Sequence, residues 1–216
     1  MKKLLLYFGR FVYLVLVVGV SSAFAGAYDD FFRAVEVDNG SVVQTLLQRG
    51  FDANSRDSKG QTGLYLALRG ESFKVAEVLM KAPGLDVNAL NEAGESPLMM
   101  AALKGQVDWS KQLLDRGAAL NKPGWTPLHY AACGPEVSVV KLLLDRGASI
   151  DAGSPNGSTP LMMAAQYGSE ASVDLLLARG AKTQIKNDRG LSVADFARMA
   201  MREALASKLE RAPPSL

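Results

Sequence analysis

The single histidine and the single cysteine of this 216-residue chain have side chains that commonly act in catalysis, and they lie one helical turn apart. His129 is the only histidine and Cys133 is the only cysteine. A cysteine and a histidine can form a nucleophile and its base when a third group orients the imidazole. No Asp or Asn is placed to orient His129, so the pattern favours a structural role for both residues. We therefore expect no catalytic site at this pair.

Methionine pairs are the second set of side chains that could bind a ligand. They are Met99-Met100, Met162-Met163 and Met199-x-Met201. Thioether sulfurs favour Cu(I), so Cu(I) or redox handling by these methionines and Cys133 is an alternative function. In the two PLMMAA stretches, however, the methionines replace His129 and Tyr130 of a similar stretch, and core packing explains them better. No carboxylate pair, phosphate-binding loop or zinc-ligand spacing is visible, so we expect no cofactor, no metal and no enzymatic activity.

One short motif recurs along the chain at nearly constant intervals. TPLHYAAC begins at Thr126 and TPLMMAAQ at Thr159, and weaker copies begin at Thr62, Ser96 and Ser192. These starts are 34, 30, 33 and 33 residues apart. Such a period predicts a repeated pair of helices, which buries its apolar side only by stacking on its neighbours.

Each motif is expected to begin a helix. A threonine hydroxyl can accept a hydrogen bond from an unpaired backbone N–H, and a proline in the first helical turn has no N–H to leave unpaired. Gly168, or Gly134 with Pro135, then ends this first helix. A second, apolar helix follows, as over residues 139–144, and Gly147 marks its end.

The period and the T-P-L-H-x-A motif resemble those of the ankyrin repeat family from about Ala27 to Leu209, and TPLHYAACGPEVSVVKLLLDRGA is close to the family consensus. The resemblance implies an all-α solenoid of stacked helix-turn-helix units with β-turn or hairpin fingers. It also implies that His129 braces the turns of neighbouring repeats by hydrogen bonding. Finally, it implies binding of a protein partner through finger tips and a concave helix face.

The units at the two ends of the array differ from the others. Residues 26–60 lack the T-P-L-H opening, and residues 191–210 have Val193 in place of the motif proline. Both are expected to be capping repeats, because a terminal unit has one face in water. Four repeats are expected over residues 61–190, with starts near 61, 95, 125 and 158, and residues 211–216 form a tail.

Two departures from the period predict local irregularities. The stretch from Gly117 to Thr126 is three residues shorter than the stretch from Gly147 to Thr159, so the finger at 121–124 should be stunted. The stretch 82–84 contains a proline, and one extra residue lies near it. This insertion should deform the end of a second helix.

Residues 1–25 have the pattern of a signal peptide. Three basic residues accompany an apolar run over 11–20, and Ala-Phe-Ala precedes Gly26. A run of this length is too short to span a bilayer comfortably. We expect cleavage after Ala25, export to the periplasm and no membrane contact afterwards. The alternative is an uncleaved segment that tethers the repeats to the inner membrane.

The charge of the chain argues against nucleic acid as a partner. The chain has 24 Lys and Arg against 22 Asp and Glu. Without the three basic residues of the signal segment the count is 21 against 22, a net charge of −1. Such a chain has no excess of cations to bind a phosphate backbone. A single cysteine also forms no internal disulfide. We expect the chain to be a monomer and to bind a protein partner.

The expected binding surface consists of the positions at which ankyrin repeats vary. Trp, Tyr and Arg dominate measured hot spots, so Trp125, Tyr167 and Arg69 are the expected anchors. For Trp125 the alternative is packing beneath the shortened finger. The expected site residues are Lys59, Gln61, Arg69, Glu92, Glu95, Lys104, Trp125, Tyr167, Asp188 and Arg189. The expected function is a non-catalytic periplasmic scaffold, with inhibitor, immunity and protective roles left open.

Overall fold

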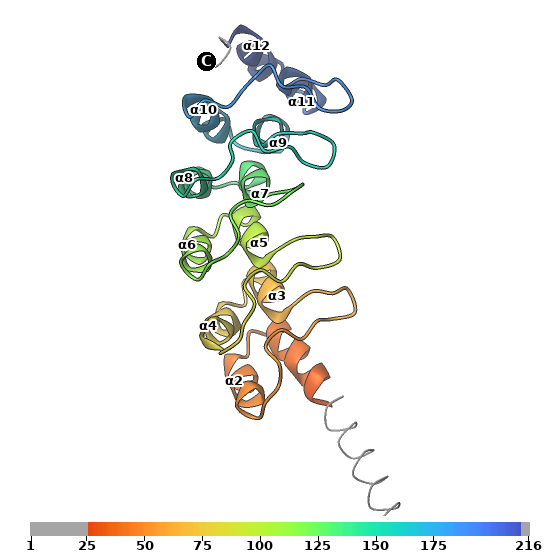
Figure 1. The fold of residues 1–216 in the computed structure, drawn as a ribbon, viewed down its shortest axis with the longest axis vertical. Helices are drawn as coiled ribbons and strands as arrows, with labels where there is room; N and C mark the ends of the chain where they lie inside the picture. The colour runs from red at the N-terminus through yellow and green to blue at the C-terminus, as the bar shows by residue number, and fades with distance from the viewer. Residues whose placement is uncertain (1–25, 213–216) are drawn as a thin grey trace, which may run out of the picture. The chain divides into compact units, whose positions relative to one another are not determined.

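The computed structural model describes residues 26–212, in which helices alternate with loops (Figure 1). Internal contacts divide the described chain into two units, one with residues 26–57 and 62–85 and one with residues 58–61 and 86–212. The expected signal peptide and residues 213–216 of the expected tail lie outside the described residues.

The first unit contains helical residues 26–36 and the helices α2 (Gly40–Gln48), α3 (Gly63–Gly70) and α4 (Phe73–Lys81). Phe31 is fully buried and lies directly against the start of α3. A Cβ atom added to Gly63 would come within 2.6 Å of the Phe31 ring. Glycine therefore replaces the motif proline here because the phenyl ring occupies the space of a side chain.

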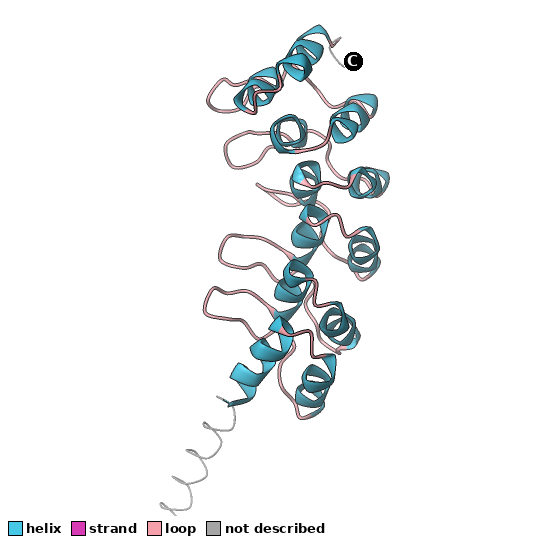
Figure 2. Cartoon of the chain, turned by 180° about the vertical axis from the view of Figure 1, so that it is seen from behind, coloured by secondary structure: helices cyan, strands magenta, loops and turns pink. Residues whose placement is uncertain are grey.

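The second unit contains four pairs of helices. They are α5 (Pro97–Leu103) with α6 (Val107–Asp115), α7 (Pro127–Cys133) with α8 (Val137–Asp145), α9 (Pro160–Tyr167) with α10 (Glu170–Ala178), and α11 (Val193–Met199) with α12 (Glu203–Arg211). The first helices of these pairs, α5, α7, α9 and α11, form one row in Figures 1 and 2, and the loops that precede them project beyond that row. Neighbouring first helices pack on one another.

The prediction of an all-α repeat solenoid is confirmed. Among residues 26–212 the only β pairing is an isolated bridge between Arg56 and Thr62 in the first unit, so the fingers are turns rather than strands. The helices α3, α5, α7 and α9 begin two residues after the repeat starts expected at 61, 95, 125 and 158.

The motif begins a helix, as its residue types predict. Pro97, Pro127 and Pro160 are the first residues of α5, α7 and α9. The Ser96 hydroxyl accepts the N–H of Met99 at 3.3 Å, and the Thr159 hydroxyl accepts that of Met162 at 3.4 Å. These bonds satisfy donors that the helix itself cannot pair.

The predicted irregularities are also visible. In Figures 1 and 2 the loop before α7 projects less far than the loops before α5, α9 and α11, so the finger at 121–124 is stunted. In the first unit, α4 keeps nine residues, but its C-cap Ala82 is extended, with φ −66° and ψ 133°. The C-caps of α6, α8 and α10 have ψ near 5° instead. The extra residue thus changes the helix cap and not the helix length.

A ladder of amide and carboxylate side chains joins consecutive loops of the second unit. Asn88 donates to Gly117 O at 3.0 Å, Asn121 donates to Gly147 O at 3.1 Å, and Asp151 accepts the N–H of Lys182 at 3.0 Å. Each bond fixes a loop against the next repeat, because it pairs a backbone group that helix geometry leaves free. The loops that carry the fingers are therefore held to one another.

Ser110 provides a stability prediction, because its hydroxyl is fully buried in α6 and has no hydrogen-bond partner within the described chain. A buried, unsatisfied hydroxyl destabilises a fold by about 1–3 kcal/mol. The Ser110→Ala variant should therefore raise the free energy of unfolding by about 1 kcal/mol, measured by urea denaturation. Exposed Ser138→Ala on α8 is the control, and a loss of stability in Ser110→Ala would contradict the prediction.

Candidate protein-binding surface

His129 links two repeats, and both of its ring nitrogens have hydrogen-bond partners. Its side chain is 1 % exposed. Nδ1 accepts the Thr126 N–H at 3.1 Å and lies 2.9 Å from the Thr126 hydroxyl, while Nε2 lies 3.0 Å from Ser158 O in the next finger. Because Nδ1 accepts a backbone N–H, the proton of the neutral ring is on Nε2 and is donated to Ser158 O. The expected brace between neighbouring turns is confirmed.

Two buried methionines replace this histidine in neighbouring repeats. Met99 and Met162 are 0 % and 1 % exposed. Their Sδ atoms lie 3.4 Å from the backbone nitrogens of Ser96 and Thr159, which is the contact that His129 Nδ1 makes with Thr126. A thioether is a weak acceptor but still pairs the N–H. These two sulfurs are thus used inside the fold, which weakens the copper alternative.

Burial lowers the pKa of His129 below its ordinary value of 6.5, and the hydrogen bond to Ser158 O offsets only part of that effect. The unfolded chain therefore binds a proton at a higher pH than the folded chain does. The contribution of neutral His129 to the free energy of unfolding should be fully present above pH 6.5. It should fall as the pH drops from 6.5 toward the lowered pKa of the folded state. Urea denaturation at pH 7.5 and 5.5 tests this, and His129→Met should show a smaller loss because the chain has no other histidine.

Cys133 is poorly suited to act as a nucleophile. The residue is half-buried, and burial raises the pKa of its thiol to about 11. The reactive thiolate is therefore scarce at neutral pH. Across residues 26–212 no three His, Cys, Asp or Glu side chains are grouped in a way that could hold a metal ion.

The expected site residues lie on the first helices and fingers, as their positions in the repeat imply. Most are exposed, and Gln61, Glu95 and Trp125 are half-buried. Arg69 lies on α3 in the first unit, with its guanidinium 5.8 Å from the centre of the Tyr65 ring. The others belong to the second unit and comprise Lys59, Gln61, Glu92, Glu95, Lys104, Trp125, Tyr167, Asp188 and Arg189.

Trp125 packs at the base of the stunted finger. Its ring meets the His129 ring edge-on, with 5.2 Å between centroids, and its carbonyl accepts a hydrogen bond from Lys122 Nζ at 3.1 Å. Trp125 therefore supports the His129 brace from one side and leaves part of its ring accessible. The alternative that Trp125 packs beneath the shortened finger therefore describes part of the role of this residue.

Glu95 and Tyr130 form a polar contact between a finger and a first helix. The Tyr130 hydroxyl donates to Glu95 Oε1 at 2.9 Å, and Asn91 donates to Glu95 Oε2 at 2.8 Å. Because Tyr130 is 35 residues from Glu95, this contact joins two repeats of the second unit. Both side chains are half-buried.

Sequence reasoning included Tyr167 among the anchors but left two exposed methionines at the C-terminal end out of the binding surface. Met199 and Met201 are 54 % and 89 % exposed, and Tyr167 is 61 % exposed. Arg202 follows them, and its Nη1 lies 2.9–3.2 Å from three carbonyl oxygens at the end of α9. The position of each residue within the repeat was the available signal, since Gly105 occupies in its repeat the place that Met201 occupies here.

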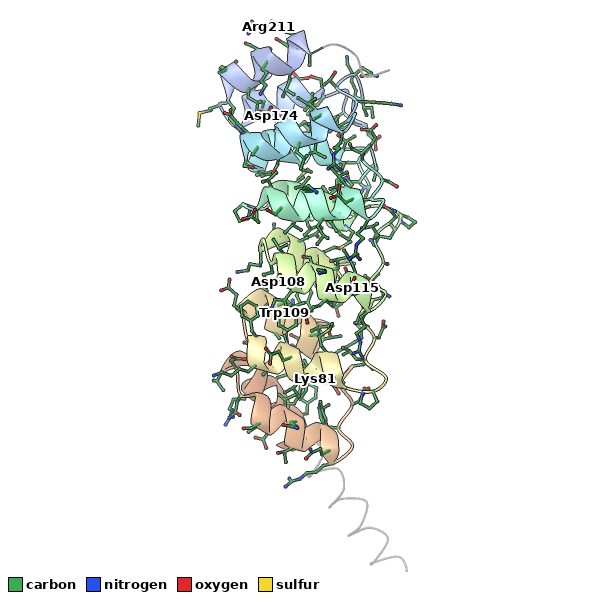
Figure 3. The ribbon with its side chains drawn as sticks, turned by 90° about the vertical axis from the view of Figure 1, so that its left-hand side faces the viewer. Lys81, Asp108, Trp109, Asp115, Asp174 and Arg211 are labelled. Carbon is green, nitrogen blue, oxygen red and sulfur yellow. The ribbon has the colours of Figure 1, made fainter. Side chains whose placement is uncertain are left out.

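The second helices have a charged surface whose ion pairs connect neighbours. Asp115 pairs with Arg146 at 2.8 Å, Asp145 with Arg179 at 2.8 Å, and Asp174 with Lys208 at 2.5 Å. In Figure 3, Asp115 and Asp108 lie on α6, Asp174 on α10 and Arg211 on α12. Exposed pairs of this kind contribute about 0–1 kcal/mol each. This face is suited to solubility more than to apolar recognition.

The comparisons with known proteins agree with this architecture. A family model described as ankyrin repeats (3 copies) matches residues 31–123 and 111–187. The chain therefore belongs to the ankyrin repeat family. Ankyrin repeats form protein-binding scaffolds, and the family is typically non-catalytic. None of the helices within residues 26–212 is long and apolar enough to cross a membrane.

Three relatives show how the similarity is distributed. Ankyrin repeat protein nuc-2 of Neurospora crassa is 33 % identical over 69 % of this chain and 11 % of its own length. The putative palmitoyltransferase ZDHHC13 of Danio rerio is 32 % identical over 73 % of this chain and 20 % of its own length. I-Kappa-B like protein C2 of Microplitis demolitor bracovirus is 31 % identical over 38 % of this chain and 46 % of its own length. The chain thus spans less than half of each of these relatives.

Proposed function

We propose that this chain is a non-catalytic scaffold, exported to the periplasm, that binds one protein partner through its first helices and fingers. The arrangement of the second unit supports this proposal most directly. Side chains from several repeats project from one surface, and the bonds of His129, Asn88 and Asn121 hold the repeats that carry them. Because these elements are ordered before binding, little conformational entropy is lost when a partner docks.

The chemistry of the surface supports recognition of a protein. Lys104, Glu92 and Arg189 are exposed charged residues, whereas Trp125 and Tyr130 offer partly accessible rings. A mixed surface of this kind favours a shaped protein epitope over a uniformly charged polymer. Inhibition, protection or simple tethering of the partner would all use the same surface.

An affinity capture experiment tests the surface. The purified chain is compared with a Lys104→Glu, Arg189→Glu variant, which changes the first-helix and finger surface, and with a Lys111→Glu, Arg116→Glu variant, which makes the same charge change at α6. A partner should be retained by the wild-type chain and the α6 variant and lost by the first variant. Equal retention by all three proteins would refute the proposed surface.

Export is tested separately. Fractionation of the producing cells, followed by N-terminal sequencing of the purified chain, should place the chain in the periplasm with Gly26 as its first residue. A chain that retains Met1 and sediments with membranes would support the tethered alternative instead.

A further inference from the structure

Three apolar side chains are exposed where α9 and α11 end. Tyr167 and Met199 are the last residues of these helices, Met201 follows in the next turn, and their exposed fractions are 61 %, 54 % and 89 %. The two helices pack on one another. The hydrogen bonds from Arg202 to Ala164 O, Ala165 O and Gly168 O place the two turns side by side. We call Tyr167, Met199 and Met201 the turn patch.

Folding does not account for the residue types in the turn patch. Met201 has φ +58°, in the left-handed region that disfavours a side chain. The equivalent residue of an earlier repeat in the same unit is Gly105, with φ +71°. Tyr167 likewise corresponds to Lys104, because each lies eight residues after its motif start. Apolar groups thus replace glycine and lysine at exposed positions, and clustered exposed apolar side chains are typical of binding sites.

The rim of the turn patch is negatively charged. Glu170 and Glu203 lie in the first turns of α10 and α12, with side chains 70 % and 73 % exposed. Their nearest guanidinium groups, those of Arg202 and Arg198, are 4.0 Å and 3.8 Å away.

Both of those guanidinium groups are already engaged. Arg202 donates to the three carbonyls of the α9 end, and Arg198 also pairs with Asp195 at 3.4 Å and with Glu210. Four carboxylates therefore face two guanidinium groups at this end of the unit.

We propose that the turn patch binds a segment of the protein partner that presents an apolar side chain flanked by Lys or Arg. This inference rests on the proposed protein-binding function. The flexible thioethers of Met199 and Met201 can shape themselves around an apolar group beside the Tyr167 ring. Basic flanks complement Glu170 and Glu203. The same carboxylates repel an anionic lipid surface, and a second copy of the chain would bring two acidic rims together.

Selection from a random 12-residue phage-displayed peptide library tests the proposal. The purified chain and a Tyr167→Ala, Met201→Gly variant are used in parallel. Glycine suits the backbone at position 201, so the Met201 change should not destabilise the fold, and thermal denaturation verifies this. Peptides enriched on the wild-type chain should contain an apolar residue flanked by Lys or Arg. They should bind the variant at least tenfold more weakly in fluorescence anisotropy.

A Glu170→Gln, Glu203→Gln variant separates the charged rim from the apolar centre. It should bind the same peptides severalfold more weakly, with a smaller dependence on salt. Enriched peptides that are acidic, or that bind both variants as well as the wild-type chain, would overturn the proposal and leave protein binding elsewhere on the surface intact. Failure to enrich any peptide would overturn it too, and a concurrent failure of affinity capture would show that the protein-binding function itself is wrong.

Two further measurements test whether a second copy of the chain or a membrane occupies the turn patch instead. Sedimentation of the wild-type chain should show a monomer, and self-association that is lost in the Tyr167→Ala, Met201→Gly variant would assign the patch to a second copy. Vesicles with anionic lipids should not bind, and binding that depends on Met201 would assign the patch to a membrane. Either result overturns the proposal.

Discussion

A Gly168→Ala variant is expected to lose about 3 kcal/mol of unfolding free energy, because a Cβ atom at this position has no room. It would lie 2.1 Å from Ala132 O, a backbone atom of α7 that no side-chain rotation can remove. The backbone of Gly168 is extended, with φ −88°, so alanine brings no conformational penalty of its own. The whole loss comes from forcing α9 away from α7, and urea denaturation measures it.

Two other glycines serve as controls for Gly168. Gly180 has φ +89°, and a Cβ atom added there would meet nothing within 4 Å, so Gly180→Ala should cost only about 1–2 kcal/mol through backbone strain. A Cβ on Gly134 would lie 2.8 Å from Leu103 O, and Gly134→Ala should give an intermediate loss. If Gly168→Ala were no worse than Gly180→Ala, close helix packing would not be the reason for this glycine.

A His129→Ala variant is expected to lose about 3 kcal/mol as well. The change leaves a cavity in a fully packed position and removes the partners of two buried groups, the Thr126 N–H and Ser158 O. Because His129 joins α7 to the next finger, the loss should appear as a lower urea midpoint. Protection of the Thr126 amide from hydrogen exchange should fall with it.

His129→Met is the matched comparison for this prediction. Met99 and Met162 show that a thioether fills the equivalent space and accepts the equivalent N–H at 3.4 Å. The methionine variant keeps that contact and loses only the bond to Ser158 O, so it should cost about 1 kcal/mol. A loss as large as that of His129→Ala would show that the bond between repeats dominates and the cap contributes little.

The repeat motif was sufficient to predict the helices and their caps, because these depend on residues close in sequence. Within a helix, the backbone requirements of Pro127 and Pro160 are satisfied only in the first turn, and the preceding Thr favours a helix start there. The role of His129 as a brace was implied by the resemblance to the ankyrin repeat family. The stunted finger before α7 needed no more than the length of one loop.

Contacts that depend on a different repeat could not be predicted in this way. Arg202 looks like an ordinary charged residue of a terminal helix, yet its guanidinium caps α9 from 34 to 38 residues away. The acceptor role of Met99 was hidden because methionine is usually only an apolar filler. The exposure of Met201 became visible only when the backbone placed this residue in the left-handed region. Sequence periodicity describes what repeats share, and these features are the exceptions to it.

The bonds that join one repeat of this array to the next have a consequence for how such a chain can change in evolution. The hydrogen bonds described here between repeats span 26 to 38 residues, about one period, and so connect each repeat only to its neighbour. Insertion or loss of one complete period between α5 and α10 would recreate the same local joints on either side. The length of the array, and hence the area it offers to a partner, is therefore adjustable by gene duplication without redesign of a central core.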